Sequence, residues 1–525
     1  MNQPIGRCVV GKQPGGAPTV GANRAMICVT IGRGRHSSLA EEWKEAAEAG
    51  VGLVELRIDC LRRDPDLKRI LKDRPTPIVF TIRRGVDGGL WRGNEDKRQQ
   101  LLREAVALGV DYVDLEMDIA PKIRRFGKTK RIVSYHNMKT TPVDIQDIAE
   151  KCEEFDADVV KIAASAANLA EASRVLHLAT SARAPMITIA MGEIGVFTRI
   201  LGAKYGAPFT YAGFNPERVF APGMLPHGIF KKDLCYDEIN AQTEVYGVLG
   251  DPIEQSLSPA VHNAAFRHLG LNKVMVPFLV PNGELPAFFK ELLWLDIKGC
   301  SVTIPHKEAI VPLVQQKEGA VERTGTCNTV VVQEDGRRIG YNTDYRAAMD
   351  SLEVALGGRE NEEVASPLLD KLVLILGAGG VARAIAFGLV RRGANLTITN
   401  RHDDRATQLA EEVGCKAVTW SARLSTPADV VINATPVGMH PNVDDTPLPG
   451  SVFSRPGMIA FDTIYHPENT MMLKLARERG AQAITGVDMF LRQAAHQFKL
   501  YTGLDAPVEV MRAVLHRKLR PLRDE

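Results

Sequence analysis

The sequence predicts an α/β protein in which a (β/α)8 barrel is followed by a second α/β domain and a Rossmann domain. The length of 525 residues exceeds what one ordinary hydrophobic core supports. Eight short apolar runs alternate with helix-like stretches within about 190 residues, which is typical of a parallel sheet closed into a barrel. Later in the chain, an apolar strand leads directly into a glycine-rich turn and a helix.

The composition indicates a globular protein and excludes several other classes. Apolar residues make up 45% and charged residues 24%, so we exclude a disordered chain, a coiled coil and a fibre. The formal net charge of +2 gives no reason to expect binding to nucleic acid or membranes, and no apolar run reaches membrane-spanning length. The eight cysteines form no Cys-x-x-Cys pair, so we expect a cytoplasmic protein without a metal site.

The N-terminal half carries the barrel pattern. Residues 1–24 are rich in Gly and Pro and are expected to form a flexible tail. The expected strands are 26–31, 52–59, 77–82, 110–116, 131–135, 158–163, 185–191 and 208–213, with helices such as 39–49 and 95–108 between them. An open doubly wound sheet is the alternative arrangement for this pattern.

The C-terminal half begins after a polar break at 231–243. A strand at 244–250 opens a new series of strands and helices, which contains a buried strand at 371–376. The turn Gly377-Ala-Gly-Gly-Val-Ala382, a helix at 383–392 and a second strand at 395–399 follow. The basic stretch 508–519 is interpreted as a solvated terminal helix.

Polar side chains gather at the carboxyl ends of the predicted barrel strands, where barrels carry out their chemistry. Lys161 lies inside an apolar strand, which normally excludes an unpaired ammonium group. It is therefore either paired with a buried carboxylate such as Glu55 or an amine that forms a Schiff base with a ketone. The arginines and the histidine around it favour the second interpretation and a small anionic carbonyl substrate: Arg57, Arg83, Arg199 and His136.

These segments together resemble type I 3-dehydroquinate dehydratase over about residues 25–230: Val54-Glu-Leu-Arg-Ile-Asp59, Phe80-Thr-Ile-Arg83 with Gly88-Gly89, Ser134-Tyr-His-Asn137, Val160-Lys-Ile162 and Ala221-Pro-Gly223. The resemblance implies that Lys161 forms an imine with the substrate ketone. His136 would then remove the neighbouring proton and later protonate the departing hydroxyl. Arg199 would clamp the carboxylate, and Glu55, Arg57 and Arg83 would position hydroxyls and charge.

Three residues depart from the family pattern. Asp87 stands where the family usually has a glutamate beside the catalytic histidine. Phe220 and Met224 flank the Ala-Pro-Gly segment, where the family usually has a serine and a glutamine. Losing one hydrogen bond to a substrate hydroxyl costs about 1–1.5 kcal/mol, or roughly tenfold in binding or rate.

The glycine-rich turn predicts a dinucleotide site. Glycines let the backbone approach a pyrophosphate, which rests on the amides at the start of the helix. We assign this contact to the turn Gly377, Ala378, Gly379, Gly380 and Val381. The next strand ends at Asn400 and Arg401, with Arg405 nearby, and an arginine there suits the 2′-phosphate of NADP. Asp403 and Asp404 oppose this charge, but NADP remains the preferred cofactor.

A second set of motifs, in this order, is similar to shikimate dehydrogenase over about residues 244–519: Ser256-Leu-Ser-Pro259, Ser301-Val-Thr-Ile-Pro-His-Lys307, Gly325-Thr-Cys-Asn328, Asn342-Thr-Asp344, Asn433-Ala-Thr-Pro436, Gly438-Met439 and Gln493-Ala-Ala-His496. The resemblance implies hydride transfer between NADP and the C3 carbon of 3-dehydroshikimate. Lys307 would act as the acid and base, oriented by Asp344.

The same resemblance implies binding roles and a domain layout. Ser256 and Ser258 would hold the carboxylate, while Thr303, Asn328, Tyr465 and Gln493 would hold hydroxyls. Thr463 and Gly486 would lie beside the nicotinamide. The expected domains are a barrel at 25–240, a shikimate-binding domain at 244–345 and 488–525, and an NADP-binding Rossmann domain at 346–487.

The two implied reactions are consecutive, because dehydration of 3-dehydroquinate yields the 3-dehydroshikimate that is reduced to shikimate. We therefore expect a bifunctional lyase and oxidoreductase of the shikimate pathway whose partners are small-molecule substrates. The sequence does not indicate how many copies of the chain associate. Three alternatives stay open. The barrel could be a degenerate scaffold, the second half could be a quinate or NAD-specific dehydrogenase, or the chain could be a non-catalytic metabolite-binding protein.

Overall fold

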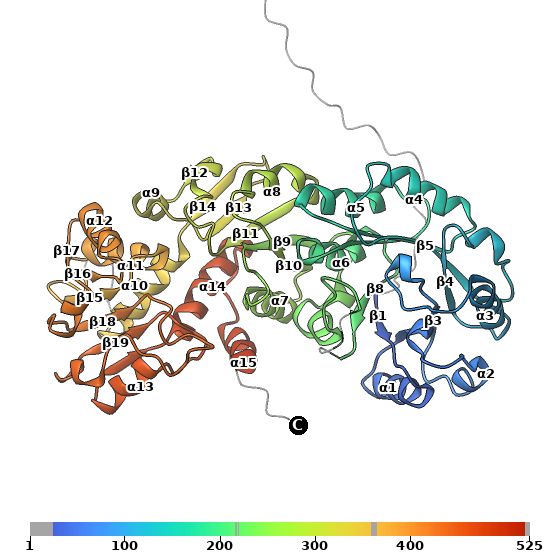
Figure 1. Ribbon diagram of the computed structural model, residues 1–525. Helices are drawn as coiled ribbons and strands as arrows, with labels where there is room; N and C mark the ends of the chain where they lie inside the picture. Colours follow the sequence, from blue (N-terminus) through green and yellow to red (C-terminus); the bar gives the residue numbers. More distant parts are fainter. Residues whose placement is uncertain (1–24, 216–217, 219, 359–364, 520–525) are drawn as a thin grey trace, which may run out of the picture.

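The computed structural model describes residues 25–215, 218, 220–358 and 365–519, and Figure 1 shows them as an elongated molecule with the barrel at one end. The expected tail at 1–24 and residues 520–525 lie outside the described residues. Among the described helices, none is long and apolar enough to cross a membrane.

The N-terminal half is an eight-stranded parallel sheet in the order β7-β6-β5-β4-β3-β2-β1-β8, which confirms the predicted barrel rather than an open doubly wound sheet. Each strand lies within two residues of its predicted limits at either end. The strands are β1 (Met26–Ile31), β2 (Leu53–Arg57), β3 (Ile78–Thr81), β4 (Tyr112–Glu116), β5 (Lys130–Asn137), β6 (Val159–Ser165), β7 (Met186–Met191) and β8 (Phe209–Gly213).

Helices surround this sheet and pack their apolar faces against it. Side-chain caps fix several helix starts; for example, Asn94 accepts a hydrogen bond from the Lys97 amide at the start of α3. The helices are α1 (His36–Glu48), α2 (Leu67–Ile70), α3 (Glu95–Ala107), α4 (Ile145–Glu154), α5 (Leu169–Ser181) and α6 (Val196–Leu201).

The second sheet has the order β10-β9-β11-β13-β14-β12, in which β9, β10 and β11 are parallel and β13 is antiparallel to its neighbours. Its strands are β9 (Glu244–Gly250), β10 (Lys273–Leu279), β11 (Ile297–Val302), β12 (Gln316–Lys317), β13 (Thr329–Val332) and β14 (Arg338–Tyr341). Its helices are α7 (Ser258–His268), α8 (Leu285–Glu291), α9 (Gly319–Thr324), α14 (Gly486–Thr502) and α15 (Val508–Leu519).

The third sheet has the order β17-β16-β15-β18-β19-β20 with all neighbours parallel, which is the Rossmann order. Its strands are β15 (Leu372–Leu376), β16 (Asn395–Thr399), β17 (Lys416–Ala417), β18 (Val430–Asn433), β19 (Ile459–Asp462) and β20 (Gln482–Ile484). Its helices are α10 (Thr343–Ala355), α11 (Gly380–Arg391), α12 (Asp403–Val413) and α13 (Met471–Glu478). Thus α11 begins three residues before the predicted start, inside the glycine turn.

Two features correct or extend the sequence interpretation. The C-terminal helix α15 is not merely a solvated end, because Met511, Val514 and Leu515 are buried and the helix packs against α7. The barrel and the second sheet share one hydrophobic core, and the Trp294 indole donates a 2.9 Å hydrogen bond to the Ser173 hydroxyl of α5. The barrel is therefore packed firmly against the second sheet.

Candidate active sites

A pocket at the carboxyl ends of the barrel strands brings together every barrel residue predicted to function. Register explains this convergence: Ser134 pairs with Lys161 and His136 with Ala163, so alternate residues of β5 and β6 face the same side. The pocket is lined by Glu55, Arg57, Arg83, Asp87, Gly88, His136, Met138, Lys161, Ala163, Ile189, Met191, Arg199, Tyr211, Phe220, Ala221 and Met224.

Lys161 is 6% exposed, and it faces both a carboxylate and an aromatic ring. Its Nζ lies 3.2 Å from an Asp114 carboxylate oxygen, 3.9 Å from Glu55 and 4.0 Å from the centre of the Tyr211 ring. Its closest ion pair is therefore with Asp114 rather than with Glu55. The amine nevertheless lines the pocket, so the ion pair and a reaction with a bound ketone are compatible.

Sequence reasoning missed Asp114, which organises the base of the pocket. Its carboxylate accepts hydrogen bonds of 2.6 Å from Arg83 and 2.6 Å from the Ser134 hydroxyl. Burial alone would raise the pKa of Asp114, but the charges of Arg83 and Lys161 hold it well below its usual value. An acidic residue within the apolar strand 110–116 was a signal of the same kind as Lys161.

A second missed carboxylate, Glu116, connects this network to the surrounding helices. It accepts hydrogen bonds from Arg83 at 2.9 Å and from Arg98 of α3 at 2.7 Å. Arg83 is thus committed to two protein carboxylates. Because its guanidinium already donates to Asp114 and Glu116, fewer of its N–H groups are left to contact a substrate.

His136 lies on β5, two residues beyond the register partner of Lys161, and its Nδ1 is buried without a hydrogen-bond partner in the described part of the chain. Burial, followed by the positive charges of Arg83 and Lys161, holds the pKa of His136 well below its usual value. The imidazole is therefore neutral near pH 7. A neutral, unpartnered ring nitrogen is suited to accept a proton from a bound molecule.

Asp87 lines the pocket, but its carboxylate is bound to a different partner from the one implied by the resemblance. It accepts a 2.6 Å hydrogen bond from Arg84, which also donates to Asp118 at 2.7 and 3.0 Å. No hydrogen bond joins it to His136 among the described residues.

Arg199 is the residue of the pocket that most clearly lacks a counter-charge. It is 2% exposed and donates to the Pro222 carbonyl at 3.2 Å, while its Nε has no partner. No described carboxylate lies within ion-pair distance of it, and burial lowers its pKa to about 10. By contrast, Arg57 forms a two-pronged pair with Asp59 at 2.9 and 2.8 Å. A bound anion would supply the charge that Arg199 lacks.

A second pocket, with a volume of about 160 Å³, lies between the second and third sheets. It contains every residue predicted to bind or convert the second substrate, as well as Val381, Thr463 and Gly486 from the predicted cofactor set. Its lining residues are Val248, Ser256, Ser258, Ser301, Val302, Thr303, Lys307, Asn328, Asp344, Val381, Thr463, Tyr465, Gly486, Met489, Phe490, Gln493 and Gln497.

Lys307 and Asp344 form the charged pair of this pocket, with 2.6 Å between Nζ and the carboxylate oxygen. Asn342 caps α10 by accepting a hydrogen bond from the Tyr345 amide, which places Asp344 in the first helical turn. Lys307 lies in the loop after β11. Asp344 is buried and Lys307 is partly buried, but both line the pocket, so a ligand in the pocket can reach the pair.

Hydrogen bonds hold the neutral polar residues of this pocket in place. Asn328 donates to the Thr343 hydroxyl at 2.9 Å and accepts from the Thr343 amide at 2.8 Å. Gln497, which sequence reasoning missed, accepts from the Ser301 hydroxyl at 3.0 Å and donates to Thr329 at 3.0 Å. Because Gln497 lies one helical turn after Gln493 on α14, its helical spacing was the available signal.

The glycine turn has the geometry that a dinucleotide requires. Gly377 has a φ of +115°, and a Cβ there would lie 2.7 Å from the Ala434 carbonyl. At Gly379 and Gly380 an added Cβ would meet only open space, so the start of α11 is accessible. Arg401 and Arg405 are exposed after β16, and neither forms an ion pair with any described residue. These residues fit NADP.

Gly486 is required for another reason. A Cβ at this position would lie 2.2 Å from the Ile464 carbonyl, so only glycine allows α14 to begin beside the 463–465 segment. Thr463, Tyr465 and Gly486 consequently meet at the same side of the pocket. Among the described residues, no cluster of His, Cys, Asp and Glu suited to a metal ion is found.

Comparison with known families divides the chain in the same way as these pockets. Residues 27–231 match the model of type I 3-dehydroquinase, and residues 248–330 match the shikimate dehydrogenase substrate binding domain. Residues 371–449 match a model described as NADP oxidoreductase, coenzyme F420-dependent. Residues 486–516 match the shikimate 5'-dehydrogenase C-terminal domain.

Individual relatives extend this result to almost the whole chain. The chloroplastic bifunctional 3-dehydroquinate dehydratase/shikimate dehydrogenase of Arabidopsis thaliana is 36% identical over 518 residues, covering 94% of this chain and 85% of the relative. The shikimate dehydrogenase (NADP+) of Methanothermobacter thermautotrophicus is 39% identical over 293 residues, covering 54% of this chain and 99% of the relative.

A solved structure of shikimate dehydrogenase in complex with NADP+ is 36% identical, with a TM-score of 0.50, and covers 54% of this chain and 98% of that chain. The match to the Arabidopsis thaliana enzyme, which spans both halves, agrees with the order of the two pockets along the chain. The chain therefore belongs to the family of bifunctional 3-dehydroquinate dehydratase/shikimate dehydrogenases.

Proposed function

We propose that the chain catalyses two consecutive steps of the shikimate pathway, each in one of the two pockets. The barrel dehydrates 3-dehydroquinate to 3-dehydroshikimate, and the second half reduces this product to shikimate with NADPH. The observation that carries the proposal is the pair of lysine sites, because Lys161 and Lys307 each line a pocket beside a carboxylate.

In the barrel, Lys161 is the nucleophile. Its amine adds to the substrate ketone, and water leaves to give an imine, which makes the neighbouring C–H bond acidic. His136 removes that proton, and the same imidazole returns it to the departing hydroxyl, which leaves as water. Hydrolysis of the imine then releases the product and restores the amine. The lowered pKa of His136 keeps the imidazole unprotonated, so that it is available to accept this proton.

Arg199 binds the substrate carboxylate, and Glu55, Arg57 and Arg83 position the substrate by charge and hydrogen bonds. Asp87 acts indirectly in this proposal, because its carboxylate is bound to Arg84 rather than to the histidine. We therefore assign it to positioning the 85–89 turn at the pocket edge. The Arg199 assignment is supported by the absence of a described carboxylate that would neutralise it.

In the second pocket, Lys307 exchanges a proton with the substrate oxygen, and Asp344 orients and stabilises the ammonium group. Bound NADPH supplies the hydride. Ser256 and Ser258 hold the carboxylate; Thr303, Asn328, Tyr465 and Gln493 hold hydroxyls. Thr463 and Gly486 line the nicotinamide side, and the turn at 377–381 with Asn400, Arg401 and Arg405 holds the remainder of the cofactor.

We propose the domain limits 25–240, 244–345 with 488–525, and 346–487. The split second domain is supported by α14 and α15, which return from the third sheet and pack against the second. The partners are small molecules, namely 3-dehydroquinate, 3-dehydroshikimate, shikimate and NADP. We place the protein in the cytoplasm.

The decisive test of the barrel is covalent trapping. Borohydride should reduce the imine between Lys161 and 3-dehydroquinate, adding the substrate mass to the peptide that contains Lys161. The Lys161→Met variant should show no adduct and no dehydratase activity, while its dehydrogenase activity serves as the internal control for folding. Continued trapping in this variant would contradict the assignment.

A coupled assay tests the two halves separately. The protein receives 3-dehydroquinate with NADPH or NADH, and 3-dehydroshikimate and shikimate are quantified individually. Formation of both with NADPH is expected. Shikimate formed only from added 3-dehydroshikimate would favour a degenerate barrel, an alternative suggested by Asp87 and Met224, which both line the pocket. Equal rates with the two cofactors would contradict the role of Arg401.

A further inference from the structure

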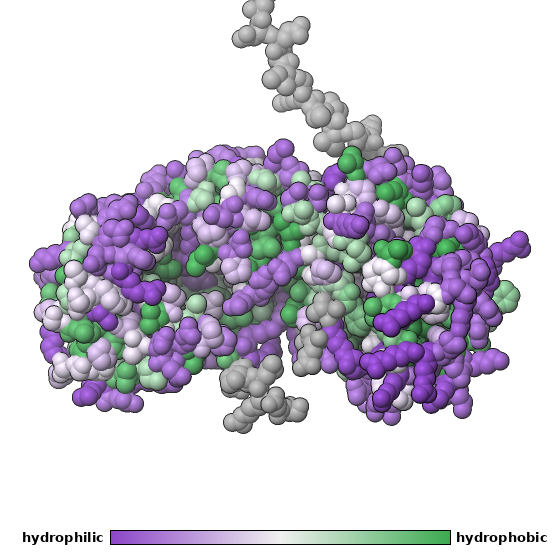
Figure 2. Space-filling model, in the orientation of Figure 1, coloured by the Kyte–Doolittle hydropathy of each residue, from purple (hydrophilic) through white to green (hydrophobic). Residues whose placement is uncertain are grey.

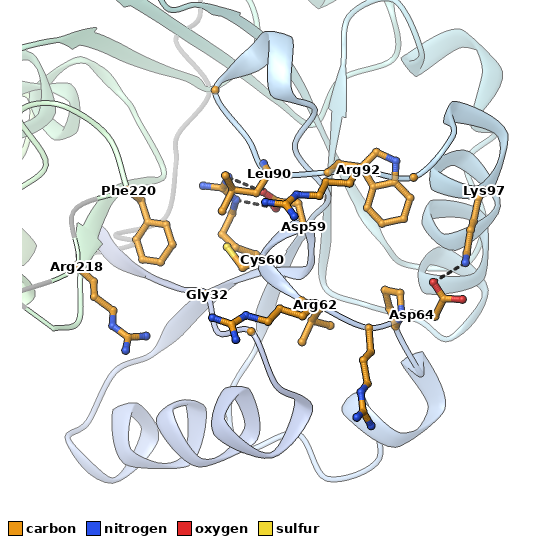
Figure 3. A pocket seen from close by; sticks show the side chains of 18 residues that line it. Gly32, Asp59, Cys60, Arg62, Asp64, Leu90, Arg92, Lys97, Arg218 and Phe220 are labelled. Atoms are coloured by element: carbon orange, nitrogen blue, oxygen red, sulfur yellow. Dashed lines mark hydrogen bonds and ion pairs between the residues drawn. The ribbon is translucent and has the colours of Figure 1, made fainter.

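A large outer cavity, with a volume of about 1020 Å³, lies outside the catalytic pocket at the mouth of the barrel (Figure 3). Loops after four barrel strands form it: residues after β1, β2, β3 and β8. Its lining residues are Gly32, Gly34, Arg57, Asp59, Cys60, Leu61, Arg62, Arg63, Asp64, Pro65, Gly88, Leu90, Trp91, Arg92, Gly93, Lys97, Arg218 and Phe220.

The cavity carries an excess of positive charge. Its lining has six basic and two acidic side chains, and both acidic side chains are already paired. Asp59 is bound to Arg57 at 2.8 Å, and Asp64 to Lys97 at 2.6 Å. Four arginines remain without an ion pair to any described residue: Arg62, Arg63, Arg92 and Arg218.

These arginines approach the cavity from different sides. In Figure 3 the guanidinium groups of Arg62, Arg92 and Arg218 point toward the space between them, from the loops after β2, β3 and β8. All four arginines are exposed, so they remain hydrated when the cavity is empty. Figure 2 shows the most hydrophilic residues of this face of the barrel gathered around α1 and α2.

The outer cavity borders the catalytic pocket directly. Arg57, Gly88 and Phe220 line both, and the Arg57 guanidinium lies 5.7 Å from the centre of the Phe220 ring. In the inner pocket most cations are neutralised by Glu55, Asp59, Asp114 and Glu116. The net positive charge of the outer cavity therefore comes from the four unpaired arginines.

We propose that this outer cavity is an anion-attracting antechamber of the barrel, which gathers the carboxylate substrate and delivers it past Phe220 to Arg199. The inference rests on the proposed dehydratase function and assigns a role to arginines that do not touch the reacting atoms. A cleft with one sign of charge raises the local concentration of an oppositely charged ligand and its rate of association by roughly 10- to 1000-fold.

Ionic strength separates this role from catalysis. Exposed charges act over about 30 Å at 0.01 M salt, but over less than about 8 Å above 0.15 M. An effect of the antechamber should therefore appear in kcat/KM of the dehydratase at low salt and disappear at high salt. The value of kcat should not change, because the chemistry takes place deeper in the barrel.

The test compares two triple variants of the full chain. Arg62→Gln/Arg63→Gln/Arg92→Gln removes three charges from the antechamber. Lys72→Gln/Lys128→Gln/Lys151→Gln removes three exposed charges that precede β3, β5 and β6, at the opposite end of the barrel, and serves as the matched control. Dehydratase kcat and KM are measured with 3-dehydroquinate at about 0.01 M and about 0.5 M ionic strength.

The antechamber variant should lose about tenfold in kcat/KM at low salt, with kcat unchanged, and should approach the unaltered protein at high salt. The control variant and the dehydrogenase activity of both variants should not change. An equal loss in the control, or no loss in the antechamber variant at low salt, would overturn the proposal. If the unaltered protein lacked dehydratase activity, the proposed function itself would be wrong.

Discussion

The unpaired guanidinium of Arg199 yields a prediction in which stability and activity change in opposite directions. Burial depresses its pKa from 12.5 to about 10, which corresponds to about 3 kcal/mol because one unit of pKa equals about 1.4 kcal/mol. Replacing it in Arg199→Met removes this buried charge and fills most of the same volume. We expect the barrel to become more stable by up to about 3 kcal/mol.

The same substitution should disable the dehydratase. Losing a desolvated contact between charges costs about 2–5 kcal/mol, or roughly 30- to 5000-fold in kcat/KM for 3-dehydroquinate. Thermal unfolding and steady-state kinetics of one preparation measure both effects. In the unaltered protein, the anionic substrate should stabilise the barrel, and Arg199→Met should lose this stabilisation.

Arg98 provides the matched control, because it is also buried but is bound to Glu95 and Glu116. Arg98→Met leaves Glu95 without its partner and removes one of the two arginines that bind the buried Glu116, so it should destabilise the barrel by about 3–5 kcal/mol. If Arg199→Met were as destabilising as Arg98→Met, the inference that Arg199 is an unpaired buried charge that a bound anion would neutralise would be refuted. Unchanged kcat/KM would refute its role as a clamp.

Three further predictions concern the second half of the chain. Lys307→Met should lower kcat for shikimate oxidation by about 10²- to 10⁴-fold while dehydratase activity measured in the same sample stays constant. Arg401→Ala should raise KM for NADPH by roughly tenfold or more without changing KM for NADH, since it removes a charged hydrogen bond to the 2′-phosphate; parallel changes for both cofactors would contradict this. Burial lowers the pKa of His262 from 6.5 to about 4, so the unfolded chain takes up a proton at a higher pH than the folded protein does. The free energy of unfolding should therefore decrease as the pH falls from 6.5 toward 4, by about 2 kcal/mol at pH 5. His262→Leu should remove this loss in pH-dependent unfolding, whereas the exposed His268→Gln on the same helix should keep it.

The fold was largely predictable because the local patterns and the tertiary arrangement agree. The eight barrel strands and the β15–α11–β16 unit were expected at nearly their observed positions. The end of β5 was missed, since its pairing with β6 continues through Asn137 and Ala164. The packing of α15 was also missed, although the spacing of Met511, Val514 and Leu515 is that of an amphipathic helix.

The candidate sites were less predictable wherever a residue acts through a partner on another strand. The pairing of Asp114 with Arg83 and Lys161 depends on the inward register of β3, β4 and β6, which no single segment reveals. The partner of Asp87 was likewise hidden, because Arg84 turns back toward it within the 85–87 turn. Charged residues within apolar strands nevertheless identify the site, because a buried charge requires an oppositely charged partner.

The two sites differ in where their counter-charges come from, and this difference has a kinetic consequence. In the barrel, protein carboxylates neutralise Arg83 and Lys161, so that Arg199 is left for the substrate to neutralise. In the second pocket, Lys307 already has Asp344, and neutral hydroxyls are assigned to the carboxylate. Added salt competes with charge attraction but hardly with neutral hydrogen bonds. Substrate capture should therefore be more sensitive to ionic strength in the barrel than in the dehydrogenase.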